Sequence, residues 1–326
     1  MKNKSILLIL VFTLFLFNSC DALQEQKTIK LAHGLDTGHP VHKAMIFMGQ
    51  ELEKNSEGAL KLEIYPNQQL GSERQCLELL QIGSLDMTKV SAAVMENFSP
   101  NMKVLGLPFL FKNKEHTFKV LDGEIGKSLL DGGKKYWLKG LGYYDAGSRS
   151  FYTKKAPVEK PENLKGLKIR VMESVTAMNM VSNLGGSPTP ISYGELYTAL
   201  QQGVVDGAEN NPPSFFLSRH YEVCKFYSLD EHTTIPDVLI MSTHIWDKLS
   251  KKEQVWMQKA ADASVKYQRK LWAKAETEAI EAVKKAGVTV VKPDKSVFQE
   301  KVSSMYENYK DDNEIYELIT KIKAVQ

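Results

Sequence analysis

The spacing of apolar and polar residues along the chain predicts alternating strands and helices. Residues 28–32 and 61–65 alternate with the period of a strand, and residues 41–53 between them place apolar side chains on one face of a helix. A capped helix over 73–82 and a strand over 85–90 repeat this order. Because strands that alternate with helices are typical of sheets covered by helices, the pattern predicts an α/β fold.

The second half of the chain continues this pattern and contains one very long helix. Residues 253–286 are periodic over 34 positions, which would span about 50 Å as a single helix. Gly287 supplies a natural C-terminal stop. A helix of this length is expected to contact more than one domain. Further strands are expected at 141–144, 167–171, 238–242 and 288–291, and further helices at 172–184, at 193–202 and, as an amphipathic pair, within 296–324.

The N-terminal residues predict an exported protein. Residues 1–5 (MKNKS) are basic, and residues 6–17 (ILLILVFTLFLF) form an apolar run of twelve residues. As a helix this run rises about 18 Å, whereas a membrane span needs roughly 20 residues, or about 30 Å. A short apolar run behind a basic leader is typical of a signal peptide, here residues 1–22. We expect the mature protein in the periplasm or on the extracytoplasmic face of a membrane.

Two processing sites compete within this signal. Ser19 and Cys20 end the apolar run as in a bacterial lipobox, although the two preceding residues depart from the usual pattern. The alternative is ordinary cleavage after Ala22. We favour a lipoprotein with signal 1–19 and a lipidated Cys20, because a cysteine at this position is otherwise unusual. The acyl chains would hold the protein on a membrane surface.

The composition is that of an ordinary globular protein. The 326 residues suffice for two domains, and 43% of them are hydrophobic and 25% charged. When Lys2 and Lys4 leave with the signal, 40 Lys and Arg residues face 39 Asp and Glu residues, so no nucleic-acid partner is expected. The common nucleotide-binding, hydrolase and metalloprotease motifs are absent from the sequence, and no cofactor is expected.

The cysteines and histidines do not form a metal-binding pattern. His39 and His42 are close together, but no cysteine or carboxylate follows them at ligand spacing, so no metal site is expected. Cys76 and Cys224 lie within apolar patterns. We expect both to be buried free thiols.

Two arginines are the most informative polar residues. Arg170 lies inside the predicted strand GLKIRV, and Arg149 lies in DAGSRSFY directly after another strand. A covered guanidinium needs an anionic partner, because leaving it buried and unpaired is expensive. That partner is either an internal carboxylate or the carboxylate of a ligand. The segment VDGAENNPP (205–213) is similarly open to two interpretations, as a solvated turn or as part of a site.

Several longer strings identify a family. The order YPNQQLGSER, GSLDMT, LGLPFLF, GLKIRV, GGSPTPISYGELYTALQQGVVDGAENN and YEVCKFY resembles the solute-binding component of tripartite ATP-independent periplasmic (TRAP) transporters, of the DctP-like family. The resemblance runs from Thr28 to the C-terminus. It implies a two-lobed clamshell like that of periplasmic binding proteins, with a helix-flanked β-sheet in each lobe, strand crossovers between the lobes, and one long helix spanning both.

The same resemblance implies lobe boundaries. Lobe I would comprise residues 25–147 and 236–275, and lobe II would comprise residues 148–235 and 276–326. The protein would be a monomer without enzymatic activity that works with a small and a large membrane subunit.

The resemblance also assigns the site. Arg170 matches the arginine that grips the ligand carboxylate, Arg149 matches the second cleft arginine, and Asn210 matches the amide beside that carboxylate. Lys89 adds a further polar group to the cleft. The remaining pocket positions that the family implies fall on Glu73, Ser91, Glu173, Tyr193, His33 and Asp237. In sialic-acid-binding members the position of Ser91 is acidic and that of Glu173 is an amide, so these residues argue against sialic acid.

The mixture of groups predicts a sugar acid. Several hydroxyl partners with one carboxylate grip suit a monocarboxylate sugar. The strings HGLDTGHPVH, MTKVSAAVMENF and GAENNPPSF resemble the branch that binds hexuronates such as D-glucuronate or D-galacturonate. We expect such a ligand, delivered for ion-coupled uptake. The alternatives are a C4-dicarboxylate or another organic acid in the same family, and, in a different class, an exported uronate lyase.

Overall fold

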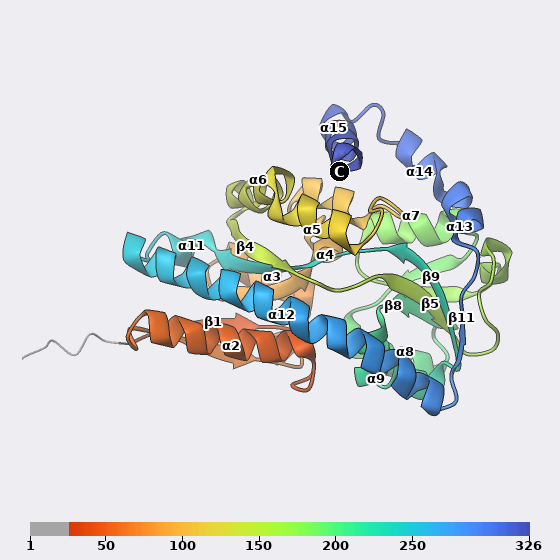
Figure 1. Ribbon diagram of the computed structural model, residues 1–326, viewed down its shortest axis with the longest axis horizontal. Helices are drawn as coiled ribbons and strands as arrows, with labels where there is room; N and C mark the ends of the chain where they lie inside the picture. The colour runs from red at the N-terminus through yellow and green to blue at the C-terminus, as the bar shows by residue number, and fades with distance from the viewer. Residues whose placement is uncertain (1–25) are drawn as a thin grey trace, which may run out of the picture.

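The structure, a computed structural model, describes residues 26–326 (Figure 1). The predicted signal peptide and Cys20 lie outside these residues. The chain folds into two lobes, each built on one β-sheet with helices packed against it. This is the predicted α/β clamshell. Within residues 26–326, no helix is both long and apolar enough to cross a membrane.

The first lobe is built on a five-stranded sheet with the order β2-β1-β3-β10-β4. Strand β1 pairs in parallel with β2 and β3, and β10 lies antiparallel between β3 and β4. Its strands are β1 (Lys27–Ala32), β2 (Leu60–Tyr65), β3 (Met87–Ser91), β4 (Leu138–Tyr144) and β10 (Asp237–Ser242). Its helices are α2 (Pro40–Asn55), α3 (Glu73–Gln81), α4 (Ala92–Met95), η2 (Pro100–Gly106), α5 (Lys114–Asp122), α6 (Glu124–Gly132), η3 (Gly133–Tyr136) and α11 (Thr243–Trp246).

The second lobe is built on a six-stranded sheet with the order β11-β9-β5-β8-β6-β7. Its strands are β5 (Arg149–Thr153), β6 (Lys168–Val171), β7 (Ser187–Pro190), β8 (Gly207–Asn210), β9 (Phe226–Thr233) and β11 (Thr289–Val291). Its helices are η4 (Pro161–Leu164), α7 (Val175–Asn183), η5 (Tyr193–Glu195), α8 (Leu196–Gln202), α9 (Pro212–Leu217), α10 (His220–Val223), α13 (Lys295–Val302) and α14 (Ser304–Glu307).

Four segments join the lobes, the last of them residues 308–312 near the C-terminus. The chain crosses between β4 and β5 and returns between β9 and β10. The third link is the predicted long helix, α12 (Lys251–Lys285), whose 35 residues run along both lobes (Figure 1). Its N-terminal part packs Met257 and Trp272 into the core of the first lobe, and its C-terminal part packs Val283 into the core of the second.

The C-terminal region departs from the prediction. Residues 296–324 were expected to form two helices of the second lobe, but they form α13, α14 and α15 (Asn313–Ala324). Helix α15 buries Ile315, Ile319 and Ile322 in a core of the first lobe, against η2 and α6. The assignment of residues 276–326 to lobe II is therefore wrong for α15, because an amphipathic pattern shows that a face is buried but not which lobe covers it.

Four strands, β5, β7, β8 and β9, lacked a periodic signal in the sequence. Strand β7 lies at the edge of its sheet, and its sequence SPTP is typical of a turn. Every residue of β5 and β8 is buried, and β9 is buried at most positions. Central strands covered on both faces do not alternate, so the period of a half-buried strand is absent from them. Cys76 and Cys224 are buried free thiols, as predicted.

Candidate ligand-binding site

The two sheets present corresponding edges to a cavity between the lobes. In the first lobe β3 ends at Ser91, and the antiparallel β10 begins opposite it at Asp237. In the second lobe β8 ends at Asn210, beside the start of the antiparallel β5. Ligands of open α/β sheets bind beyond the carboxyl ends of the parallel strands. The cavity lies at these ends and has an empty volume of about 690 Å³, including its opening to solvent.

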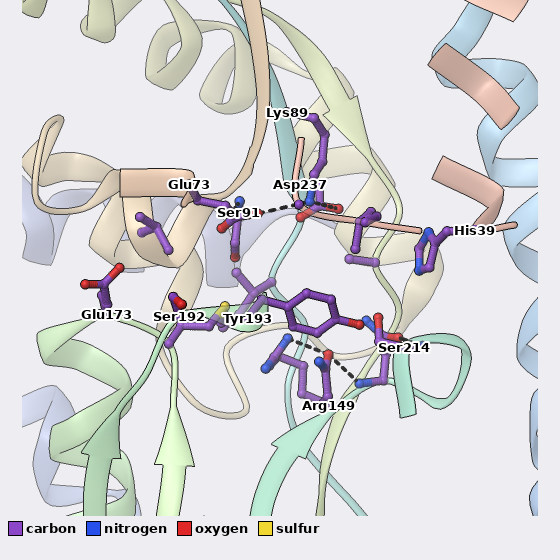
Figure 2. A pocket seen from close by; sticks show the side chains of 18 of the residues that line it. His39, Glu73, Lys89, Ser91, Arg149, Glu173, Ser192, Tyr193, Ser214 and Asp237 are labelled. Atoms are coloured by element: carbon purple, nitrogen blue, oxygen red, sulfur yellow. Dashed lines mark hydrogen bonds and ion pairs between the residues drawn. The ribbon is translucent and has the colours of Figure 1, made fainter. Parts of the chain in front are cut away.

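Nine of the ten residues predicted for the site line this cavity (Figure 2). The first lobe contributes one group of them and the second lobe the other, and the two groups face each other across the cavity. The first-lobe residues are Glu73, Lys89, Ser91 and Asp237, and the second-lobe residues are Arg149, Arg170, Glu173, Tyr193 and Asn210.

His33 is the exception. Its Nε2 lies 2.9 Å from His42 Nδ1, and its Nδ1 accepts a hydrogen bond from the Leu35 N–H at 3.1 Å. Both ring nitrogens are thus engaged within the first lobe, and His33 is not among the lining residues. The prediction that it faces the cleft is wrong, because a residue just past a strand can turn either way and this ring turns toward α2.

Arg170 is a buried cation without a counterion among residues 26–326. Arg170 belongs to strand β6 and is 2% exposed. Its Nε donates to the backbone oxygen of Ile191 at 2.8 Å, whereas Nη1 is buried and has no hydrogen-bond partner among the described residues. Burial lowers the pKa of Arg170, but a guanidinium remains charged in proteins. Such a group fits the two oxygens of a carboxylate.

Arg149 has a protein partner instead. It forms a bidentate ion pair with the buried Glu209, with Nη2 at 2.8 Å from Oε1 and Nε bonded to Oε2. His232 Nε2 lies 3.4 Å from the same carboxylate, and His232 Nδ1 lies 2.7 Å from Asp230 Oδ2. Burial works against the charged form of Glu209, but Arg149 and His232 outweigh it and lower its pKa to about 2. Arg149 is therefore neutralised before any ligand arrives.

Asn210 stands between the two arginines. Its Oδ1 accepts hydrogen bonds from Arg149 Nη1 and from the backbone N–H of Asn211, both at 2.9 Å. The carbonyl side of the amide is thus fixed by the protein, which orients its Nδ2 donor. Tyr193 bonds through its hydroxyl to Ser218, and burial raises the pKa of its phenol.

The first-lobe side of the cavity carries a compact charge cluster. Lys89 Nζ lies 3.1 Å from Glu73 Oε1 and 3.1 Å from Asp237 Oδ2, and Glu73 Oε2 accepts from the Ser91 N–H at 3.2 Å. Burial opposes the charge on Lys89, but Asp237 and Glu73 outweigh it and raise the pKa of the lysine. Burial raises the pKa of Asp237, and the Lys89 ammonium opposes that rise. This side therefore offers carboxylate oxygens that accept hydrogen bonds.

Sequence reasoning missed several residues of the site, and four of them matter for its chemistry. His39 and Trp272 line the first-lobe side, Ser214 lines the second-lobe side, and Glu209 lies behind Arg149. His39 was considered only as a metal ligand. Glu209 directly precedes Asn210, so its place in the motif DGAEN was a signal for the partner of one cleft arginine.

The fold and the cavity define a class of protein. Two α/β lobes joined by two strand crossovers and one long helix enclose a cavity with a buried cation on one side and acceptors on the other. This arrangement is that of a two-lobed binding protein for a small organic acid.

Comparison with known proteins identifies the family. The family "Bacterial extracellular solute-binding protein, family 7" (DctP) matches residues 31–312, and the chain belongs to this family of TRAP solute-binding proteins. The family resemblance predicted from the sequence is confirmed.

Three similar proteins illustrate the match. The TRAP solute-binding protein of Bradyrhizobium sp. BTAi1, solved with galacturonate, is 43% identical with a TM-score of 0.89 and matches over 91% of this chain and 99% of that one. The protein of Pseudomonas putida F1, solved with D-glucuronate, is 37% identical with a TM-score of 0.89, and the match covers 92% of this chain and 98% of that one. The C4-dicarboxylate-binding protein DctP of Rhodobacter capsulatus is 32% identical over 83% of this chain and 81% of its own.

Proposed function

We propose that this TRAP solute-binding protein binds a hexuronate, D-glucuronate or D-galacturonate, in the interlobe cavity. Arg170, with Asn210 beside it, holds the single carboxylate, and the first-lobe residues meet the sugar hydroxyls. The proposal rests chiefly on one observation, which is the buried Nη1 of Arg170 that no described residue satisfies. The uronates bound by similar proteins of Bradyrhizobium and Pseudomonas support the same ligand class.

The charge balance disfavours a dicarboxylate. Three cations reach the cavity, but Arg149 is paired with Glu209, and Lys89 is paired with both Glu73 and Asp237. Only Arg170 lacks a counterion among the described residues. A second carboxylate on the ligand would face acceptors on the first-lobe side, where like charges repel. A ligand with one carboxylate and several hydroxyls fits this distribution better than a C4-dicarboxylate does.

The protein acts by delivering its ligand, without chemical change, to small and large TRAP membrane subunits. A lyase would need a group that removes a proton at neutral pH. Burial raises the pKa of Tyr193, so its phenol stays protonated and is a poor base. Lipidated Cys20 would keep the protein at the membrane surface, close to these subunits.

A ligand screen tests this function. Thermal unfolding is followed with D-glucuronate, D-galacturonate, succinate and D-glucose, because a ligand that binds only the folded state raises the melting temperature. Calorimetric titration then gives the dissociation constants. Binding of a uronate with weak or absent binding of succinate and glucose supports the proposal. Tighter binding of succinate than of either uronate contradicts it.

A further inference from the structure

His39 has one ring nitrogen that the protein uses and one that it does not. It is the N-cap of α2, and its Nδ1 accepts a hydrogen bond from the Val41 N–H at 3.3 Å. Its Nε2 is buried and has no hydrogen-bond partner among the described residues. The ring lines the cavity and packs against Trp272, with 5.8 Å between the ring centroids.

The helix cap decides which nitrogen carries the proton. Because Nδ1 accepts from a backbone N–H, the single proton of the neutral ring must lie on Nε2. Burial, with the Lys89 charge as the next cause, lowers the pKa of His39 to about 3, so the ring is neutral at physiological pH. The residue is 2% exposed. The fold thus holds a neutral N–H donor in one orientation at the wall of the cavity, and a buried donor without a partner is costly.

This donor complements its neighbours. Figure 2 shows His39 at the same cavity as Asp237 and Lys89. Glu73 and Asp237 can only accept hydrogen bonds, and the ammonium of Lys89 is already shared between these two carboxylates. A sugar hydroxyl both donates and accepts. The Ser91 hydroxyl and Trp272 Nε1 also carry donors on this side. The imidazole N–H of His39 is held in one orientation by the helix cap, and it is placed to give a hydrogen bond to a ligand oxygen.

We propose that His39 determines ligand specificity by donating a hydrogen bond from Nε2 to a hydroxyl or ring oxygen of the bound sugar acid. This inference rests on the proposed function. The same hydrogen bond orients the ligand, with its carboxylate at Arg170 in the second lobe and its oxygen-bearing carbons toward the first lobe. A small acid that carries the carboxylate alone leaves the His39 donor unsatisfied and is rejected.

Two substitutions separate this role from helix capping. His39→Asn keeps an N-cap acceptor for α2, and its shorter side chain leaves no donor at the position of the imidazole Nε2. His39→Phe keeps a flat ring but removes both functions. Ser250→Ala is the matched control, because Ser250 caps α12 in the same lobe and does not line the cavity. Each variant is titrated with D-glucuronate and D-galacturonate, and each is melted without ligand.

The expected result is a loss of affinity without a loss of fold. His39→Asn should weaken uronate binding at least about fivefold, since a ligand oxygen loses its partner, and its ligand-free melting temperature should stay close to that of wild type. His39→Phe should lose affinity and melt lower, whereas Ser250→Ala should melt lower and keep wild-type affinity. Wild-type affinity in folded His39→Asn overturns the inference.

A spectroscopic measurement gives an independent check. In ¹⁵N-labelled wild-type protein, the His39 Nε2–H resonance should shift downfield at saturating D-glucuronate, as expected for a new hydrogen bond. An unshifted resonance at saturation overturns the role of His39 while leaving the proposed function intact. Failure of the wild-type protein to bind either uronate would instead overturn the proposed function, and it would be evident before any variant is compared.

Discussion

Replacing Arg170 by lysine keeps a positive charge in β6 but removes the planar guanidinium. In the wild type, Nε is held by the Ile191 backbone oxygen and Nη1 has no partner among the described residues. A lysine carries its donors on one nitrogen at the end of a flexible chain, so it cannot reproduce the fixed planar spacing of Nε and Nη1. We therefore expect the variant to lose at least one charge-assisted hydrogen bond to the ligand carboxylate. Such a bond contributes about 1.5–3 kcal/mol, or roughly 10- to 150-fold in Kd.

Methionine at position 170 extends the same argument. It removes both bonds of a bidentate contact, about 3–6 kcal/mol in total, so hexuronate binding should weaken by at least roughly 150-fold. The ligand-free protein should lose little stability, because the lost charge-assisted bond to Ile191, about 1.5–3 kcal/mol, is offset by removal of a buried charge that has no counterion among the described residues.

Arg149 provides the matched control. Arg149→Met leaves Glu209 buried without its bidentate partner, and breaking a buried ion pair in this way costs about 3–5 kcal/mol of folding free energy. The two arginines should thus differ in ligand-free stability, which Arg149→Met should lower and Arg170→Met should leave close to that of wild type.

Calorimetric titration with D-glucuronate, combined with denaturant unfolding of the ligand-free variants, measures both affinity and stability. Wild-type affinity in a folded Arg170→Lys protein would refute the assignment. Loss of ligand-free stability in Arg170→Met comparable to that in Arg149→Met would show that Arg170 is structural.

Three further outcomes are expected. Small-angle scattering should show a smaller radius of gyration at saturating uronate, because two crossovers and α12 allow a hinge motion, and Arg170→Met at the same uronate concentration should show no change. Burial opposes a charge on His232, but Asp230 and Glu209 outweigh it and raise the pKa of this histidine to about 9, above its unfolded value near 6.5. The stabilising contribution of the charged ring is therefore complete below about pH 6.5 and is lost as the pH rises through 9. The difference in melting temperature between wild type and His232→Asn should shrink over that interval, and a constant difference would contradict the assignment. Cys20→Ala should release the protein from the membrane fraction or block its processing, and a wild-type protein that is already soluble and begins at Leu23 would exclude the lipid anchor.

The sequence predicts best where one face of an element is exposed. The strands β1 and β2 and the helices α2 and α12 alternate or repeat, because half of each surface meets solvent. The strands β5 and β8 are buried on both faces, so the pattern disappears at the strands that carry Arg149 and Asn210. Their place in the site followed from the family resemblance and not from periodicity.

The chemistry of the site is likewise only partly predictable from the sequence. The sequence shows two arginines that each need an anion, but residue type alone does not show which of them has an internal partner. That difference depends on Glu209, which the fold pairs with Arg149 and not with Arg170. His33 and His39 show the same limit, since both follow β1 but only the ring of His39 reaches the cavity.

The position of the ligand carboxylate tests the account most directly. It is measured in a crystal structure of the protein with D-galacturonate. We predict a carboxylate oxygen within hydrogen-bond distance of Arg170 Nη1 and sugar hydroxyls facing Glu73 and Asp237. A carboxylate bound at Lys89 in the first lobe, with Arg170 Nη1 out of reach of the ligand, would contradict the account.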